Sequence, residues 1–207
     1  MRAPEESWRL FIALAIPANV RAKLKAHIDR LRESCPEVSA SWSREENLHL
    51  TLKFLGETSV AKVESLSQAA ALAAGALEPF EIVVKGLGSF PPRGQPRVLW
   101  VGIEDPSGGL GQLHQRLEDQ CSQAGFAREQ RPFHPHLTIA RLRKPQGSRQ
   151  LAELHKEIGF EAEMVSTSAL VVVRSELRSQ GSRHTVISRH SFSCAQSEHR
   201  IVESRQS

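Results

Sequence analysis

Two segments of the sequence share one pattern, a histidine and a threonine separated by a single leucine. The first contains His49 and Thr51, and the second contains His136 and Thr138, so the two histidines are 87 positions apart. In a β-strand, residues two apart leave the same face, so each segment presents an imidazole beside a hydroxyl. Leucines at positions 48, 50 and 52 alternate with His49, Thr51 and Lys53 in the first segment. Two matching copies of this pattern favour a shared chemical role over chance.

Two imidazoles that face one another suit a reaction in which one proton is removed while another is donated, because histidine titrates near neutral pH. Phosphodiester cleavage is such a reaction, and hydroxyl and guanidinium donors stabilise the charge on its phosphoryl oxygens. Arg141 follows Thr138 by three residues, and we expect it to complete this cradle. Its odd offset from His136 places it on the opposite face of a regular strand. The expectation therefore requires a twist, a bulge or a strand end there.

The strands and helices that would carry these residues form a duplicated series. Hydrophobic spacing predicts strand, helix, strand, helix and strand, with the histidine motif in the second strand, and then the same order again. The first series covers residues 8–16, 20–31, 48–52, 60–77 and 80–84. The second covers 98–103, 110–121, 135–142, 151–158 and 169–173, and a strand at 185–188 closes it. If the halves are related by an approximate twofold axis, their polar faces meet across a central cleft.

The composition excludes several classes of protein. With 40% hydrophobic and 24% charged residues over 207 positions, the chain is typical of a soluble globular protein, and no apolar run approaches the roughly 20 residues of a membrane helix. Cys35, Cys121 and Cys194 have no C-x-x-C spacing, so we expect no disulfide framework and a reduced, cytoplasmic location. We expect residues 194–207, which are polar and aperiodic, to form a flexible tail.

The charged residues favour phosphate contacts without a polybasic tail. The formal net charge is only +4, which is too small to bind duplex nucleic acid by charge alone. Seven of the 27 basic residues are lysine, which leaves 20 arginines. A guanidinium fork matches phosphate oxygens better than an ammonium group does.

Other patterns in the sequence are weaker. The pair His134 and His136 lacks a helical H-E-x-x-H or a cysteine partner, so we expect no metal site. The glycines near 86–88 and 108–111 lack the spacing of nucleotide-binding loops, and we expect no cofactor. Histidines on predicted helices, namely His27, His114 and His155, are expected at the surface. Core packing is favoured over base stacking for the aromatic residues Trp42, Phe54, Phe90 and Trp100.

In this order the motifs resemble those of the two-histidine (2H) phosphoesterase superfamily and, within it, the RNA 2',3'-cyclic phosphodiesterases, formerly known as 2'-5' RNA ligases. The resemblance covers nearly the whole chain, through segments 10–14, 46–56, 96–100, 131–141, 173–177 and 183–186. One position departs from the pattern. The family often has an aromatic residue, commonly tyrosine, where His184 stands, and this chain has no tyrosine.

The resemblance implies an α+β fold, a single bilobal domain over residues 1–193 in which two antiparallel sheets flank a central cleft with helices outside. It implies His49 as the proton donor and His136 as the proton acceptor, with Thr51 and Thr138 holding phosphoryl oxygens and Arg141 assisting. The implied reaction needs no metal and opens a terminal RNA 2',3'-cyclic phosphate to a 2'-phosphomonoester. Similar proteins also run the reverse step, which joins RNA ends through a 2'-5' linkage.

The sequence leaves alternatives open. A related phosphoesterase acting on a small cyclic phosphate or a 2'-5' linked oligonucleotide would use the same motifs, because they read the phosphate and not the base. A non-catalytic module that binds RNA ends and a zinc hydrolase are further alternatives. For partners, we expect RNA with a 2',3'-cyclic phosphate end, no membrane and a monomeric chain.

Overall fold

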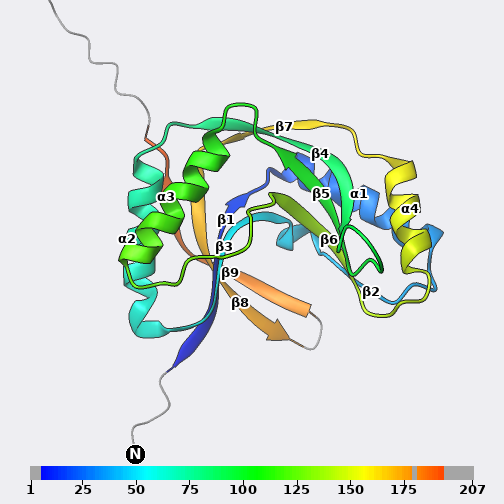
Figure 1. Ribbon diagram of the computed structural model, residues 1–207, viewed down its shortest axis with the longest axis horizontal. Coiled ribbons are helices and arrows are strands. Elements are labelled where there is room, and N and C mark those ends of the chain that lie inside the picture. Colours follow the sequence, from blue (N-terminus) through cyan, green and yellow to red (C-terminus); the bar gives the residue numbers. More distant parts are fainter. Residues whose placement is uncertain (1–5, 179–180, 194–207) are drawn as a thin grey trace, which may run out of the picture.

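The computed structural model describes residues 6–178 and 181–193, and its strands form two sheets in which every pairing is antiparallel. The first sheet has the order β3-β1-β8-β9, and the second has the order β2-β6-β5-β4-β7 (Figure 1). The strands of the first sheet are β1 (Ser7–Ala15), β3 (His49–Ser59), β8 (Ala169–Arg178) and β9 (Gly181–Ser191). Those of the second are β2 (Ala40–Trp42), β4 (Phe80–Phe90), β5 (Val98–Glu104), β6 (His136–Leu142) and β7 (Glu163–Thr167).

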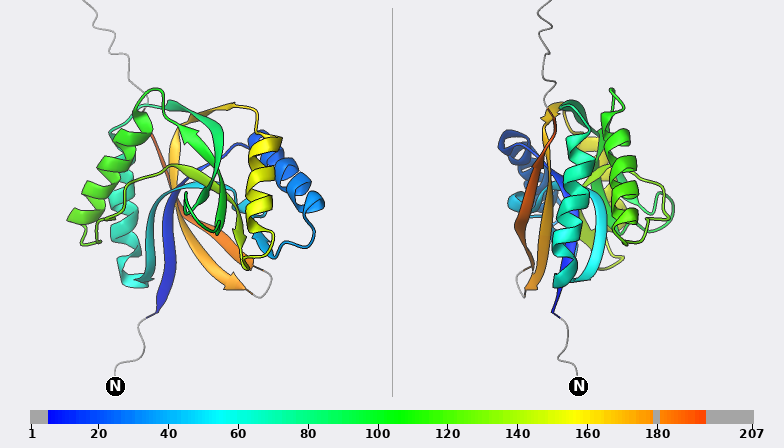
Figure 2. Two further views of the ribbon diagram at one scale, coloured as in Figure 1. Left: turned by 45° about the vertical axis from the view of Figure 1, so that its right-hand side comes forward. Right: turned by 90° about the vertical axis from the view of Figure 1, so that its left-hand side faces the viewer.

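Helices cover the outer side of each sheet, so the expected α+β class is confirmed. The helices are α1 (Ala18–Ser34), α2 (Val63–Gly75), α3 (Gly109–Gln123) and α4 (Ser148–Ile158), with short 3-10 turns at Glu45–Asn47 and Val60–Lys62. Side by side, α2 and α3 pack on the first sheet, while α1 and α4 pack on the second (Figures 1 and 2). Helix α1 buries the predicted apolar stripe of Val20, Leu24 and Ile28, whereas α4 buries Leu151 of its predicted stripe and leaves Leu154 and Ile158 half-buried.

The two predicted repeats exchange strands. In the first sheet β1 pairs with β3 of its own repeat and with β8 of the other repeat. In the second, β5 likewise pairs with β6 of its own repeat and with β4 of the other. Residues 10–14 and 169–173 are buried on both faces, which is the property of central strands. Neither lobe is therefore built from one repeat, and most buried apolar side chains of the described residues form one contiguous core.

The largest difference from the predicted elements lies in β4, which continues to Phe90 through a segment predicted as loop. Its ladder with β5 is interrupted between Val84 and Leu87, where Gly86 has a φ of 81°. At Gly88 a side chain has no room, since a Cβ would lie 2.2 Å from Cζ2 of Trp100. These glycines therefore belong to a strand and not to a loop. The short strands β2 and β7 were not predicted, and the predicted tail and Cys194 lie outside the described residues.

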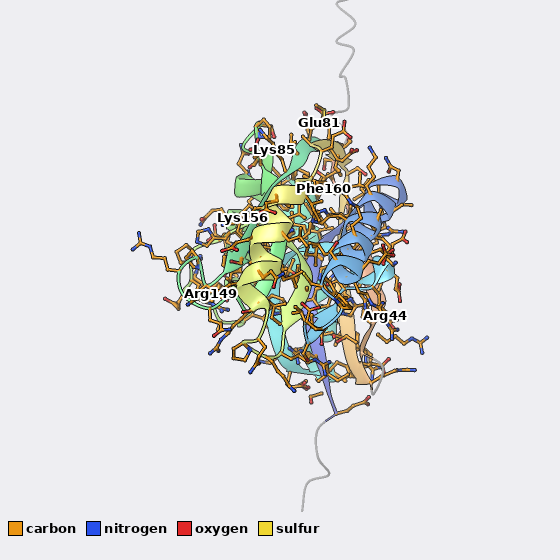
Figure 3. All side chains as sticks on the ribbon, turned by 90° about the vertical axis from the view of Figure 1, so that its right-hand side faces the viewer. Arg44, Glu81, Lys85, Arg149, Lys156 and Phe160 are labelled. Carbon is orange, nitrogen blue, oxygen red and sulfur yellow. The ribbon has the colours of Figure 1, made fainter. Side chains whose placement is uncertain are left out.

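A pair of buried histidines joins α1 to α4, which contradicts the prediction that both lie at the surface. His27 is 4% exposed and His155 is 0% exposed. Nε2 of His155 lies 3.0 Å from the carbonyl oxygen of Trp100, and Nδ1 lies 2.9 Å from Nε2 of His27. Because a carbonyl only accepts, His155 donates from Nε2 and accepts from His27. Figure 3 looks onto these two helices, with Phe160 beside them; its ring contacts His27 edge-on.

This pair predicts a loss of stability in acid. Burial, followed by the proximity of His155, lowers the pKa of His27 from 6.5 to about 4. Between these values the imidazole of His27 binds a proton in the unfolded chain but not in the folded chain. The stability linked to this group is therefore fully present above pH 6.5 and is lost as the pH falls toward 4. The linked free energy is about 3 kcal/mol. Urea unfolding at pH 7 and pH 4.5 is expected to show a smaller acid loss for His27→Gln than for the unchanged chain; equal losses would contradict this assignment.

Candidate active site

The space between the two sheets is a cleft of about 2020 Å³, and it collects the residues that the sequence singled out. The five predicted site residues, His49, Thr51, His136, Thr138 and Arg141, all line it. The first two come from β3 in the first sheet, and the other three come from β6 in the second. The repeated motif therefore supplies one imidazole and one hydroxyl from each sheet.

Backbone carbonyls fix the tautomer of both histidines in the same way. Nδ1 of His49 lies 2.7 Å from the carbonyl oxygen of Asn47, and Nδ1 of His136 lies 2.6 Å from that of His134. Since a carbonyl only accepts, Nδ1 carries the proton in each ring. The neutral form of each histidine is therefore left with an unprotonated Nε2 for chemistry.

The first histidine has further support. Its Nε2 lies 3.0 Å from Oγ1 of Thr51, and because this nitrogen is unprotonated the hydroxyl donates to it. The side-chain amide of Asn47 donates to the carbonyl oxygen of Ser182, at 2.9 Å. Ser182 lies in β9, at the opposite edge of the first sheet. Asn47 thus holds the imidazole and also ties together the two edges of a strongly curved sheet.

A bulge brings Arg141 to the face of the histidine motif, as the sequence required. Thr138 pairs with Trp100, but the next pairs join Ala140 with Leu99 and Arg141 with Val98. Ile139 is the extra residue in β6. Because Val98 and Trp100 are two apart in β5 they share a face, and their partners Arg141 and Thr138 share it too.

The same bulge occurs after the first motif, and it corrects the simple alternation predicted there. Thr51 pairs with Ala13, but Lys53 pairs with Ile12 and Phe54 with Phe11, so Leu52 is the extra residue. As a result the side chain of Lys53 turns away from the face of His49. That side chain is 2% exposed, and its Nζ lies 2.7 Å from Oε1 of Glu118 in α3.

This buried ion pair anchors a segment that leads into the cleft. Nζ of Lys53 also donates to the carbonyl oxygen of Ala127, at 2.8 Å, and the carboxylate of Glu118 accepts from the backbone N–H of Glu129, at 3.1 Å. Residues 131–134, which follow, line the cleft. Hydrogen bonds to both members of the ion pair therefore fix the position of the segment that precedes His136.

Burial makes both motif histidines poor bases. The pKa of His49 falls to about 4, chiefly through burial and next through the neighbouring His184, and the hydrogen bond to Asn47 opposes the shift. Burial also lowers the pKa of His136, against the hydrogen bond to His134 and together with the charge of Arg141. An anion between the two rings would oppose these shifts, because it favours the charged form of each imidazole.

Aromatic rings enclose the two histidines. Phe11 stacks on His49, with ring centroids 4.6 Å apart, and Phe90 meets His136 edge-on at 5.0 Å. His184, for which the sequence offered no function, lies edge-on to His49 at 5.2 Å. The one indication in the sequence was that His184 stands where the two-histidine phosphoesterases often have an aromatic residue. His114, expected at the surface, instead stacks on Phe133 at 4.0 Å and lines the cleft.

Basic side chains outnumber acidic ones around the cleft. Apart from Lys53, whose ammonium group is buried against Glu118, the basic lining residues are Arg9, Lys25, Arg32, Arg44, Arg131, Arg141, Arg143 and Arg178. The acidic ones are Asp29, Glu45, Glu46 and Glu129. In residues 6–178 and 181–193, no three His, Cys, Asp or Glu side chains gather as metal ligands would. Within the same ranges no helix has the length and apolar character needed to cross a membrane.

Comparison with known proteins gives concordant results. Residues 20–178 match the model of the 2'-5' RNA ligase superfamily. Proteins named RNA 2',3'-cyclic phosphodiesterase from Aeropyrum pernix and Methanothermobacter thermautotrophicus are 34% and 32% identical to this chain. The first alignment covers 73% of this chain and 87% of the relative, and the second covers 86% and 95%.

Solved structures agree with the sequence relatives. A protein of Thermus thermophilus aligns with a TM-score of 0.72 and 27% identity, over 89% of this chain and 97% of that one. Escherichia coli LigT complexed with 3'-AMP aligns with a TM-score of 0.69 and 27% identity, over 91% and 100%. Together with the paired histidine strands, these matches show that the chain belongs to the 2'-5' RNA ligase superfamily.

Proposed function

We propose that this protein is an RNA 2',3'-cyclic phosphodiesterase that opens a terminal cyclic phosphate to a 2'-phosphomonoester. The observation that carries the proposal is the pair of cleft-lining imidazoles, each with Nδ1 committed to a backbone carbonyl and Nε2 left for proton transfer. The names of the relatives from Aeropyrum pernix and Methanothermobacter thermautotrophicus support the same activity.

In the proposed mechanism the two histidines exchange protonation states. Nε2 of His136 accepts a proton from the water that attacks phosphorus, while protonated Nε2 of His49 gives its proton to the 3' oxygen. A bond from phosphorus to the water oxygen forms and the bond to the 3' oxygen breaks. The products are a 2'-phosphomonoester and a 3'-hydroxyl. Proton exchange with solvent then restores the starting forms of both rings.

Protonation of His49 changes the role of Thr51. The hydroxyl of Thr51 donates to Nε2 of the neutral ring, but a protonated Nε2 no longer accepts. The hydroxyl is then released to donate to a phosphoryl oxygen. In the second motif Thr138 and the guanidinium of Arg141 supply the matching donors. If a 5'-hydroxyl replaces water, the same groups catalyse formation of a 2'-5' linkage as the bond to the 3' oxygen breaks, which is the ligase activity that the proposal also includes.

The size and charge of the cleft favour RNA over a small cyclic phosphate. Pockets for small molecules usually enclose about 300 to 1,000 Å³, whereas this cleft encloses about 2020 Å³. The excess of basic lining residues favours a substrate with more than one phosphate. We also propose that the protein acts as a monomer in the cytoplasm, and the free buried thiols of Cys35 and Cys121 are consistent with that location.

Loss of either motif histidine is expected to remove activity. We expect the unchanged chain to convert a short RNA ending in a 2',3'-cyclic phosphate to the 2'-phosphate in the presence of EDTA. His49→Ala and His136→Ala should each lower kcat roughly 100- to 10,000-fold, because each removes one proton transfer. His190→Ala is the matched control, because His190 bonds Ser67 and Ser188 instead of lining the cleft.

The other outcomes of this experiment separate the alternatives. Binding of the RNA without conversion by the unchanged chain would indicate a binding module. Conversion that EDTA abolishes would indicate a metal hydrolase. Conversion of only a small cyclic phosphate or a 2'-5' linked oligonucleotide would identify a different substrate for the same chemistry.

The lowered pKa values predict an acidic optimum. The reaction needs one imidazole neutral and the other protonated, so kcat/KM is bell-shaped and its limbs report the two pKa values of the free enzyme. Both lie below the ordinary 6.5, and that of His49 is about 4. The maximum is therefore expected between pH 4 and 6.5, with a fall of roughly tenfold per pH unit beyond the upper pKa. Initial rates at subsaturating RNA from pH 4 to 9 test this; a maximum above pH 7.5 would refute it.

A further inference from the structure

The residue that corresponds to Arg141 in the first repeat is Phe54. Each stands three residues after the threonine of its motif and follows the extra residue of a bulge, Ile139 in β6 and Leu52 in β3. Phe54 pairs with Phe11, which shares a face with Ala13, the partner of Thr51. Both Phe54 and Arg141 line the cleft. Equivalent positions of the two repeats therefore offer a guanidinium on one side and a benzene ring on the other.

We propose that Phe54 is a substrate-positioning residue that stacks on the nucleobase of the nucleotide bearing the cyclic phosphate. The inference rests on the proposed phosphodiesterase function and deepens it, because the histidines, threonines and Arg141 address only the phosphate. Stacking on an aromatic ring is tolerant of base identity, since every base has a π face. Phe54 thus favours a nucleotide over a bare cyclic phosphate without selecting among the four bases.

The exposure of Phe54 is the first support. Its exposed fraction is 58%, although the residues immediately before it, Leu52 and Lys53, are 3% and 4% exposed. Among the large hydrophobic residues that are exposed in the described part of the chain, Phe54 is the one aromatic. Exposure of an aromatic ring forfeits burial that a core position would provide. A ring kept at the cleft by a strand bulge is therefore available to a ligand.

The position of the ring is the second support. Phe11 stacks on His49 at 4.6 Å and meets Phe54 at 6.1 Å between ring centroids, with the rings tilted by 50°. At about 3.3 Å per strand residue, Phe54 lies no more than about 10 Å along β3 from Thr51. This separation suits a phosphate held by the motif and the base of the same nucleotide. Arg9, two residues before Phe11 on the same face of β1, lines the cleft beyond it and suits the next phosphate.

The test compares two RNA substrates that differ only in the terminal base. One ends in a 2-aminopurine nucleotide with a 2',3'-cyclic phosphate, and the other ends in an abasic ribose with the same phosphate. Phe54→Ala is expected to raise KM for the first substrate roughly 5- to 100-fold with kcat changed less than about twofold. It is expected to leave KM for the abasic substrate unchanged, and Phe54→Trp should restore the preference. Met164→Ala, which removes a side chain 66% exposed in β7 outside the cleft lining, is the control.

A binding measurement separates this inference from the proposed reaction. Stacking quenches 2-aminopurine fluorescence, so the quench on binding should be present in the His136→Ala background and lost when Phe54→Ala is added. Quenching that depends on Phe54 without turnover by the unchanged chain would refute the reaction and retain the stacking role. Equal effects of Phe54→Ala on both substrates, or a quench that persists in that variant, would overturn the inference.

Discussion

Each sheet of this protein depends on a central strand that is completed by the other half of the chain. β1 needs β8, and β5 needs β4, because a strand in the interior of a sheet requires a hydrogen-bonding partner on each edge. This exchange joins the repeats into one core and sets the two sheets face to face across the cleft. The histidine strands β3 and β6 lie beside these central strands, so their position in the cleft follows from the exchange.

In each histidine strand, one extra residue after the threonine decides which of the following side chains face the cleft. The bulge at Ile139 turns Arg141 toward the cleft, and the bulge at Leu52 turns Phe54 toward it while sending Lys53 to Glu118. The same local irregularity therefore places a guanidinium at the cleft in one repeat and an aromatic ring in the other. The duplication keeps the backbone geometry while the side chains diverge.

Proton chemistry in the cleft is set by the protein interior more than by individual contacts. Burial lowers the pKa of both motif histidines, and the carbonyls of Asn47 and His134 fix which nitrogen is free. The third ring, His184, adds to the shift of the pKa of His49. An anion bound between the two rings would oppose these shifts, because it favours the charged form of each imidazole.

The order of the helices and of the strands other than β2 and β7, the five cleft residues and the pairing of the two motifs follow from the amino-acid sequence, because side-chain periodicity and repeated spacing are local properties. Periodicity also predicted that Arg141 could share the face of His136 only if the strand was irregular between them. The exchange of strands, the burial of His27 and His155, and the approach of His184 to His49 emerge only in the folded chain. Each of these depends on contacts between residues far apart in the sequence, and local periodicity carries no record of which distant surface covers a given side chain.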